Sequence, residues 1–277
     1  MKKLLLILLC LPMIGFGQKT YVPDGNFEAH LESNGMGDGI LNDSVLTANI
    51  INVTYLNLNN QSIDDLTGIE DFLNLEYFEC WGNNLLNGGD GYGELDLSNN
   101  TKLINIDVNY TNLTSLNVNN LSLLQSLSCS NNWLTSLNLS DNTLLHSLSS
   151  DNNLLNELDL SLNINLGGLL LGHNPQLTYL DLRNGNNTAL SIAIMETPNL
   201  HCINVDDVFW ATNNFLAINS HHYFSTNCPP PSAIQEHTTN KELLKVTDLL
   251  GKETKQTNQP LFYIYDDGTV EKRIVIE

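Results

Sequence analysis

Apolar residues recur along the middle of the chain with a period of 21 residues. Leucine returns at Leu103, Leu124, Leu145 and Leu166, and each return begins another copy of one pattern. Counted from that leucine, apolar residues stand at offsets 0, 3, 5, 10, 13 and 15, and asparagine usually stands at offset 8. A repeat of this length is typical of a protein that stacks similar coils into a solenoid.

The spacing within each copy predicts two short strands per coil and little helix. A separation of two residues, at offsets 3 and 5 and again at 13 and 15, directs the side chains of an extended segment to one side. In the copy from Leu124 these positions hold Leu127, Cys129, Leu137 and Leu139. A single coil cannot bury its own apolar face, so we expect stacking on neighbouring coils to stabilise it.

The outer copies depart from the regular pattern. The copy from Leu166 shifts by one residue in its second half, a weaker copy begins at Val53, and the copy from Leu75 contains seven extra residues. These extra residues fall in a glycine-rich stretch, residues 87–93, which lacks the Lys-Ser/Thr ending of a phosphate-binding loop. We expect this stretch to be a loop extruded between two strands.

The regular copies resemble leucine-rich repeats. The match is clearest from Leu124 to Leu134, which reads Leu-x-x-Leu-x-Cys-x-x-Asn-x-Leu. The 21-residue length and the phrases at Leu137–Ser140 and Leu158–Ser161 resemble the short repeats of surface proteins of Bacteroidetes. The resemblance extends to about residue 205, with the repeats assigned to residues 53–199, and it implies a right-handed horseshoe solenoid of mostly short β-strands. It implies a binding surface without naming the partner.

Residues 1–17 have the pattern of a secretory signal peptide. Lys2 and Lys3 precede a run of thirteen mostly apolar residues, and glycines stand one and three residues before the expected cut after Gly17. That run is too short to span a membrane and no other stretch is long enough, so we expect no transmembrane span. Lipid attachment at Cys10 is an alternative, although the preceding leucine is not a small residue. The protein is therefore expected to be secreted or attached to the outer cell surface.

Both ends of the repeat region resemble caps, which cover the terminal coils of a solenoid. Residues 18–52 form the expected N-terminal cap, with a short helix ending near Asn34. Residues 200–228 form the expected C-terminal cap, whose aromatic residues we expect to cover the last coil. These aromatic residues are Phe209, Trp210, Phe215 and Tyr223.

The end of the chain is expected to form a separate small β segment. Residues 229–239 begin with three prolines and are assigned to a linker. In residues 240–277 we expect strands at 243–249, 261–265 and 270–276, the last two joined as a hairpin. The phrases Val-Thr-Asp-Leu-Leu-Gly-Lys and Tyr-Ile-Tyr-Asp-Asp-Gly resemble the C-terminal sorting domain of the type IX secretion system. The resemblance implies recognition by that secretion machinery; a mini-domain without a signal role is the alternative.

The charge of the chain is strongly negative and unevenly distributed. The chain has 11 basic and 31 acidic residues, and between Thr20 and Cys228 only Lys102 and Arg183 are basic against 23 acidic residues, a formal charge of −21. This balance excludes a nucleic-acid partner, because binding to phosphates requires a cationic surface. A cationic partner, a neutral glycan and simple solubility outside the cell all remain open.

Four cysteines remain after removal of the signal peptide. Cys202 and Cys228 flank the C-terminal cap, and we expect them to form a disulfide, which a secreted setting permits. Cys80 and Cys129 both stand at offset 5, two coils apart, which places their Cα atoms roughly 9–10 Å from each other. A disulfide requires about 7 Å or less. These two are therefore expected to be buried free thiols.

The sequence contains no recognisable motif of catalysis, so no catalytic residues, cofactor or metal site are expected. His221-His222 has no cysteine or acidic residue nearby at the spacing of metal ligands and is assigned to the surface or the cap. Asp206-Asp207 can contact calcium, but no loop supplies the six or more oxygens required. The asparagines at offset 8 are expected to bond the backbone of the following turn. They are Asn83, Asn132, Asn153 and Asn174.

Offsets 1, 2, 4 and 6 of each copy face outward from the first strand and form the candidate binding surface. Aromatic and acidic residues concentrate there in the N-terminal coils, whereas later coils carry mainly Ser, Gly and His. Exposed Tyr and Trp commonly anchor interfaces and stack on sugars. We predict that a patch contacts the partner, made of Tyr55, Glu76, Tyr77, Glu79, Trp81 and Asp107. The alternative is that Trp81 packs under the glycine-rich loop.

These observations together predict a non-enzymatic binding or adhesion protein of the cell surface or exterior, with a protein or glycan partner. An enzyme is disfavoured because the residues after Cys228 include one histidine, His237, and no cysteine. The alternative is a structural or matrix protein of the cell surface that associates with its own copies in the presence of cations.

Overall fold

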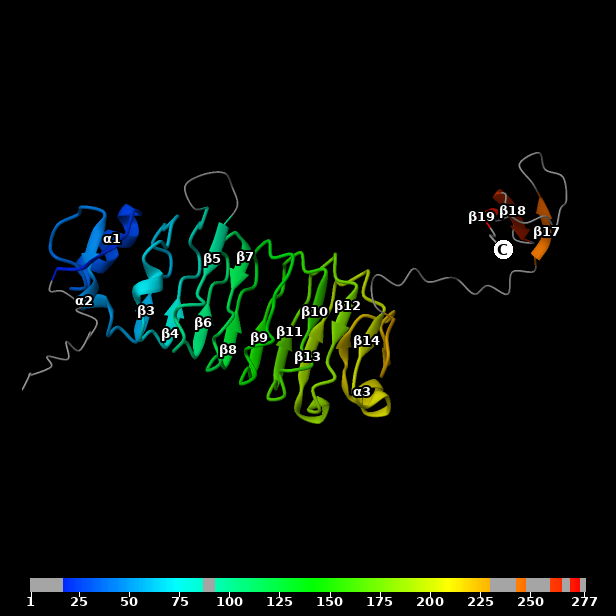
Figure 1. Cartoon of the computed structure of the whole chain (residues 1–277). Coiled ribbons are helices and arrows are strands. Elements are labelled where there is room, and N and C mark those ends of the chain that lie inside the picture. Colours follow the sequence, from blue (N-terminus) through cyan, green and yellow to red (C-terminus); the bar gives the residue numbers. More distant parts are fainter. Residues whose placement is uncertain (1–16, 87–92, 230–242, 248–259, 266–269, 275–277) are drawn as a thin grey trace, which may run out of the picture. The chain divides into compact units, whose positions relative to one another are not determined.

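The computed structural model describes residues 17–86, 93–229, 243–247, 260–265 and 270–274 (Figure 1). The chain divides after residue 230 into two compact units, which are described separately. Residues 1–16 of the expected signal peptide, residues 87–92 of the expected glycine-rich loop at 87–93 and nearly all of the expected linker lie outside the described residues. Gly93 is described and begins β5 (Gly93–Asp96).

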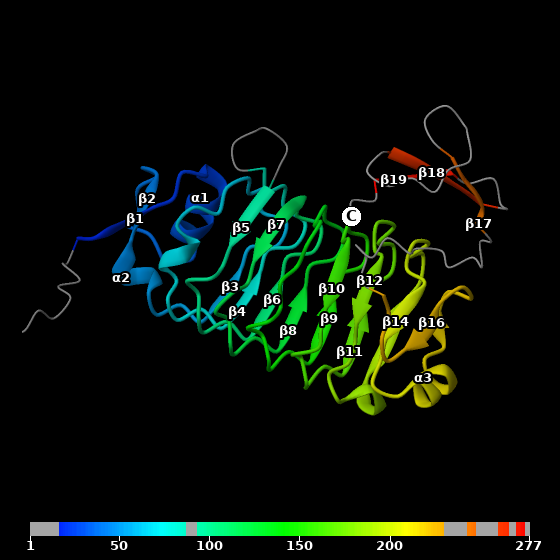
Figure 2. The ribbon, with the colours of Figure 1, turned by 45° about the vertical axis from the view of Figure 1, so that its right-hand side comes forward.

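The first unit is a parallel β-solenoid whose coils follow the 21-residue repeat. One short strand from each coil joins an eight-stranded parallel sheet, the first sheet (Figures 1 and 2). Its strands are β3 (Tyr55–Asn57), β4 (Tyr77–Glu79), β6 (Asn105–Asp107), β8 (Ser126–Ser128), β9 (Ser147–Ser149), β11 (Gly168–Leu170), β13 (Ser191–Ile194) and β15 (Ala217–Ile218). Leu127 of β8 is in register with Leu148 of β9, and both are buried. Offset 3 therefore faces the core, as the repeat predicts.

The second strand of the repeat forms in only some coils. β5 (Gly93–Asp96) pairs with β7 (Leu113–Asn117), and a four-stranded sheet contains β10 (Glu157–Asp159), β12 (Tyr179–Asp181), β14 (Cys202–Asn204) and β16 (Tyr223–Ser225). Between these two sheets, Leu137 and Leu139 are buried but belong to no strand. The expectation of two strands in every coil is therefore wrong, because apolar spacing fixes which side chains face the core without fixing the backbone pairing.

Buried asparagines connect successive coils. Asn132 donates from Nδ2 to the carbonyl oxygens of Val108 at 2.9 Å and Cys129 at 3.0 Å, and its Oδ1 accepts from the Leu113 N–H at 3.0 Å. Asn83, Asn153 and Asn174 make equivalent bonds, so the expected role of offset 8 is confirmed. A second set of buried asparagines was not anticipated. Asn142 and Asn163 stand at offset 18 of the copies from Leu124 and Leu145, and Asn100 and Asn184 lie in the copies from Leu75 and Leu166.

The N-terminal cap packs a helix against the first coil. It comprises β1 (Lys19–Tyr21), α1 (Gly25–Ser33), β2 (Ser44–Leu46) and α2 (Thr47–Ile50), with β1 antiparallel to β2. Asp24 caps α1 by accepting from the N–H groups of Asn26 and Phe27 at 2.9 and 2.8 Å. Phe27 is buried and stacks on Phe72 of the solenoid, which lies just after the 3-10 helix η1 (Ile69–Asp71). The cap thus continues the core of the repeats.

The C-terminal cap contains α3 (Val208–Asn214) and is fixed by the Cys202–Cys228 disulfide, which confirms the expected pairing. Trp210 and Phe215 make an edge-to-face contact and pack on the core. Phe209 and Tyr223 are exposed, so the expectation that all four aromatic residues cover the last coil is wrong for these two. Adjacent residues of a helix or a strand point in different directions, so Phe209 turns away when Trp210 faces the core.

The second unit is a three-stranded antiparallel sheet in the order β17 (Leu243–Thr247), β18 (Pro260–Tyr265) and β19 (Val270–Ile274). Strand β18 pairs with both others. The three strands fall within or overlap the expected ranges 243–249, 261–265 and 270–276, of which residues 248–249 and 275–276 lie outside the described residues.

Candidate binding surface

The first-sheet patch is Tyr55, Glu76, Tyr77, Glu79, Trp81 and Asp107, and the structure brings its members together on three adjacent coils. Tyr55 of β3 is in register with Tyr77 of β4, and Glu79 is in register with Asp107 of β6. These strands lie side by side near the N-terminal end of the first sheet (Figure 2). Parallel in-register pairing therefore aligns the tyrosines in one row and the carboxylates in another.

The aromatic members of the patch are open to solvent. Tyr55 is 53% exposed, Tyr77 43% and Trp81 40%. Trp81 is also held at its backbone, because its N–H donates to Oδ1 of Asn59 at 2.9 Å. The glycine-rich loop under which Trp81 was alternatively expected to pack lies outside the described residues. Three exposed rings on neighbouring coils give the patch a large contact area at a low cost in side-chain entropy.

Glu79 is the most firmly held member of the patch. Its Oε2 accepts from the side-chain amides of Asn57 and Asn59, each at 2.8 Å, and its Oε1 is 3.3 Å from the Tyr55 hydroxyl. Asn57 also donates to the Tyr55 hydroxyl at 3.1 Å. The two asparagines were not predicted as site residues, although they stand at the outward offsets 4 and 6 of the first coil. They fix the carboxylate and one aromatic ring before any partner arrives.

Asp107 lies beside Glu79 and is half-buried. Burial raises the pKa of the Asp107 carboxyl, and the neighbouring negative charge of Glu79 raises it further, while a hydrogen bond from the Asn109 N–H opposes both. Glu76, which directly precedes Tyr77 in the sequence, is partly exposed. The patch therefore combines three exposed rings with three carboxyl groups, of which Glu79 and Asp107 lie side by side.

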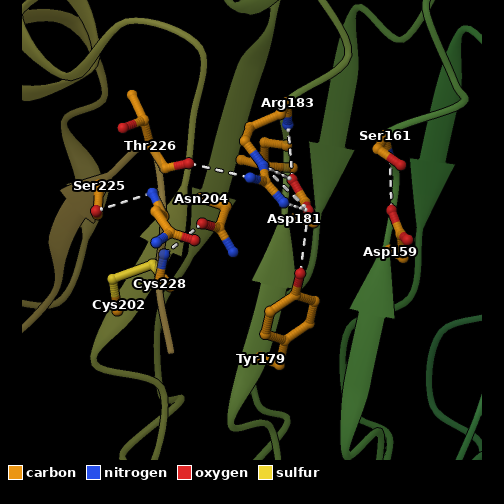
Figure 3. A network of polar contacts seen from close by, with 12 residues as sticks. Asp159, Ser161, Tyr179, Asp181, Arg183, Cys202, Asn204, Ser225, Thr226 and Cys228 are labelled. Atoms are coloured by element: carbon orange, nitrogen blue, oxygen red, sulfur yellow. Dashed lines mark hydrogen bonds and ion pairs between the residues drawn. A yellow bond between two sulfur atoms is a disulfide. The ribbon is translucent and has the colours of Figure 1, made fainter. Parts of the chain in front are cut away.

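A polar network at the other end of the solenoid was missed by sequence reasoning. Arg183 donates from Nε to Oδ1 of Asp181 at 2.9 Å and from Nη1 to the Thr226 carbonyl oxygen at 3.0 Å. The Tyr179 hydroxyl donates to Oδ2 of Asp181 at 3.0 Å, so Asp181 lies between the arginine and the tyrosine (Figure 3). Burial acts to raise the pKa of Asp181, but the hydrogen bonds from Arg183 outweigh it and the pKa is lowered.

This network connects the four-stranded sheet to the C-terminal cap rather than forming a reactive centre. Thr226 precedes the disulfide-bonded Cys228, whose N–H donates to Oδ1 of Asn204 at 2.7 Å (Figure 3). The available signal was that Arg183 is one of two basic residues in the repeat region and stands two residues after an aspartate, on the same side of an extended segment.

The remaining candidate groups have structural roles. Cys80 and Cys129 are buried free thiols, as expected, and burial raises the pKa of each to about 12, which makes both unreactive at neutral pH. His222 is buried in the cap, with Nε2 3.0 Å from the Thr197 hydroxyl. Asp207 caps α3 by accepting from the Trp210 N–H at 2.9 Å. Within the described ranges, no three His, Cys, Asp or Glu side chains are grouped to hold a metal ion.

None of the helices in the described part of the chain has the length and apolar character needed to cross a membrane.

The chain is similar in structure to several proteins of Listeria monocytogenes. The functional domain of InlJ, which includes a cysteine ladder, is 27% identical over 78% of this chain, with a TM-score of 0.59. Internalin C2 is 20% identical over 74% of this chain and 97% of its own, and the internalin InlF is 18% identical over 75% and 83%, with TM-scores of 0.37 and 0.32.

The chain covers 50% of the length of the InlJ domain. No family model matches the sequence, and no curated protein matches it. The repeat, the parallel sheet and the likeness to InlJ establish that the chain is a leucine-rich-repeat solenoid.

Proposed function

We propose that this protein is a non-enzymatic binding or adhesion protein that presents the first-sheet patch to a protein or glycan partner outside the cell. The observation that carries the proposal is the row of exposed rings on β3 and β4, aligned by register and bordered by Glu79 and Asp107. Stacked solenoid coils offer extended surfaces of this kind to their partners.

The charge of the patch favours a protein partner with exposed lysine and arginine side chains. Glu79 is held by two amide donors, and Asp107 lies one coil further along. A cationic group that approaches both carboxyl groups gains an ion-pair attraction. The neutral amides of Asn57 and Asn59 give Glu79 hydrogen bonds but no positive charge. Tyr55, Tyr77 and Trp81 would contact the apolar stems of the same basic side chains, by cation–π interaction and by burial of methylene groups.

We also propose that the signal peptide and residues 240–277 direct the protein to the exterior, the latter as a type IX sorting domain. The three-stranded sheet of β17, β18 and β19 and the sequence phrases around it support this assignment. In a host that has the type IX machinery, deletion of residues 240–277 should leave the repeat region inside the cell envelope, as measured by cell fractionation. Unchanged export of the truncated chain would contradict the assignment.

The matrix alternative, cation-dependent self-association, has less support. Neutralisation by cations can reduce repulsion between acidic chains, but within the described ranges the structure offers no grouped ligands for a metal ion. Light scattering of the purified protein with and without calcium chloride distinguishes the two functions. A calcium-dependent increase in mass would favour the matrix protein, and a constant monomeric mass favours the binding protein.

The patch is tested with variants that copy the repeat itself. Other coils carry Ser126 and Asn109 at the positions of Tyr77 and Trp81, so Tyr77→Ser and Trp81→Asn are expected to leave the fold intact. The probes are an array of lysine- and arginine-rich peptides and an array of glycans, incubated with the full secreted chain. We expect the double variant to lose at least about tenfold in affinity for the basic peptides that the parent protein binds. Equal binding of these peptides by parent and variant would remove the patch from the proposal.

A further inference from the structure

We propose that a second site, on the turns that follow the first sheet, binds a neutral oligosaccharide. The ridge hollow is a cavity of about 420 Å³ between successive coils, after β6, β8, β9 and β11. Its lining includes Tyr110, Asn131, Trp133, Asn152, Leu154 and His173. None of these residues belongs to the first-sheet patch, so the site stands or fails independently of it.

Two exposed aromatic rings line the ridge hollow. Tyr110 is 60% exposed and Trp133 is 54% exposed, although both are large and partly apolar. In the described part of the chain neither ring takes part in a ring contact, and neither the Tyr110 hydroxyl nor the Trp133 indole N–H makes a hydrogen bond. Unpartnered rings of this type can stack on the apolar face of a sugar while their polar atoms bond its hydroxyl groups.

The backbone places the lining side chains in a regular column. Tyr110, Asn131, Asn152 and His173 follow one another at the 21-residue period, and all have a left-handed backbone, with φ of 55°, 59°, 53° and 54°. Such values are uncommon for residues other than glycine. The N–H of each donates to the next coil, for example from Asn152 to the Gly172 carbonyl oxygen at 3.0 Å. The column therefore advances by about one strand spacing, ~4.8 Å per coil, which is comparable to one residue of a sugar chain.

The polar groups of the ridge hollow suit hydroxyl groups rather than charges. Within the described structure, the side-chain amides of Asn131 and Asn152 make no hydrogen bond, so each offers two donors and one acceptor oxygen. The hollow is lined by no carboxylate, although 23 acidic residues lie between Thr20 and Cys228. By contrast, Glu157 and Asp159 line a cavity of about 380 Å³ beside β10. A neutral ligand with many hydroxyl groups fits the ridge hollow better than a basic peptide does.

The repeat supplies conservative variants for a test. Leu154 occupies in the next coil the position of Trp133, and Asn131 occupies that of Tyr110, so Trp133→Leu and Tyr110→Asn each insert a residue that this backbone already holds. The full secreted chain is titrated with neutral hexasaccharides of glucose, mannose, xylose and N-acetylglucosamine, and binding is followed by isothermal titration calorimetry and indole fluorescence. Circular dichroism melting confirms that the variants are folded.

We expect at least one of these oligosaccharides to bind and to quench indole fluorescence. Trp133→Leu should weaken that binding by about tenfold or more and abolish the quenching, Tyr110→Asn should weaken it severalfold, and Tyr77→Ser with Trp81→Asn should change it less than about twofold. The proposal is overturned if no neutral oligosaccharide binds, if binding is unaffected by Trp133→Leu, or if Trp133→Leu impairs binding of lysine-rich peptides instead. Loss of binding in the first-sheet double variant alone would place the sugar in the first-sheet patch and equally overturn it.

Discussion

Replacement of Asn132 by alanine tests the physical basis of coil stacking. Asn132 is buried and bonds to three neighbouring segments: Oδ1 accepts from the N–H groups of Thr111 and Leu113 at 3.1 and 3.0 Å, and Nδ2 donates to the carbonyl oxygens of Val108 and Cys129 at 2.9 and 3.0 Å. Alanine removes these four bonds and leaves the N–H groups of Thr111 and Leu113 without their acceptor. The two carbonyl oxygens each keep one donor, Val108 from the Thr111 hydroxyl and Cys129 from Nδ2 of Asn153. At about 1 kcal/mol per bond, we expect Asn132→Ala to lower the free energy of unfolding by roughly 3–5 kcal/mol.

Two control variants are expected to lose less free energy of unfolding than Asn132→Ala. Asn142 has two side-chain donor bonds, to Val118 and Leu121, and its Oδ1 makes none, so Asn142→Ala should cost roughly half as much. Thr135→Ala changes an exposed side chain and should cost less than about 0.5 kcal/mol. Urea unfolding followed by circular dichroism measures all three. A loss of less than about 1 kcal/mol for Asn132→Ala, or a loss no larger than that of Thr135→Ala, would show that Asn132 does not stabilise coil stacking.

Three further predictions concern the disulfide and two titrating side chains. The Cys202–Cys228 bond closes a loop with a sequence separation of 26. Replacement of both cysteines by serine should therefore lower the free energy of unfolding by about 3.5 kcal/mol. Reduction of the disulfide that leaves the melting temperature unchanged would contradict this. Burial, and then the negative charge of Glu79, raise the pKa of Asp107 in the folded state, so its protonated form favours folding. The free energy of unfolding therefore falls as the pH rises above about 4, the pKa that Asp107 has in the unfolded chain. Asp107→Asn should therefore melt higher than the parent at neutral pH and close to it at pH 4, whereas a constant difference would refute the assignment. Burial, and then His221, lower the pKa of His222 in the folded state, so the neutral imidazole favours folding. This stabilising contribution is complete above about pH 6.5, the pKa in the unfolded chain, and is lost as the pH falls below it. His222→Gln should flatten that decline in melting curves between pH 7 and pH 5, and an equally steep decline in the variant would show that other groups cause it.

The period of the apolar residues was sufficient to predict the first sheet, because burial at offsets 3 and 5 and the repeat length together specify one parallel strand per coil. The same pattern did not predict which coils form a second strand. Leu137 and Leu139 are buried like their counterparts in other coils, yet their backbone makes no strand pairing. Backbone pairing between strands depends on how neighbouring coils align with each other. The apolar pattern within one coil does not predict that alignment.

The candidate site was predictable in its position and less so in its internal contacts. Outward offsets identified Tyr77 and Trp81, which are exposed. The bonds from Asn57 and Asn59 to Glu79 depend on cross-coil distances that the sequence does not give. The ridge hollow was missed for a similar reason, since its column at offset 7 carries tyrosine, asparagine and histidine in different coils and is recognised only by its shared backbone conformation.

We propose that this solenoid is a binding protein with two separate surfaces, and one surface plasmon resonance experiment tests this proposal most directly. The parent chain, the Tyr77→Ser/Trp81→Asn variant and the Tyr110→Asn/Trp133→Leu variant are each exposed to lysine- and arginine-rich peptides and to neutral hexasaccharides. We predict that the first variant loses peptide binding and keeps sugar binding, and that the second shows the reverse. Equal binding of every probe by all three proteins, or binding of none by the parent chain, would contradict the two proposed surfaces.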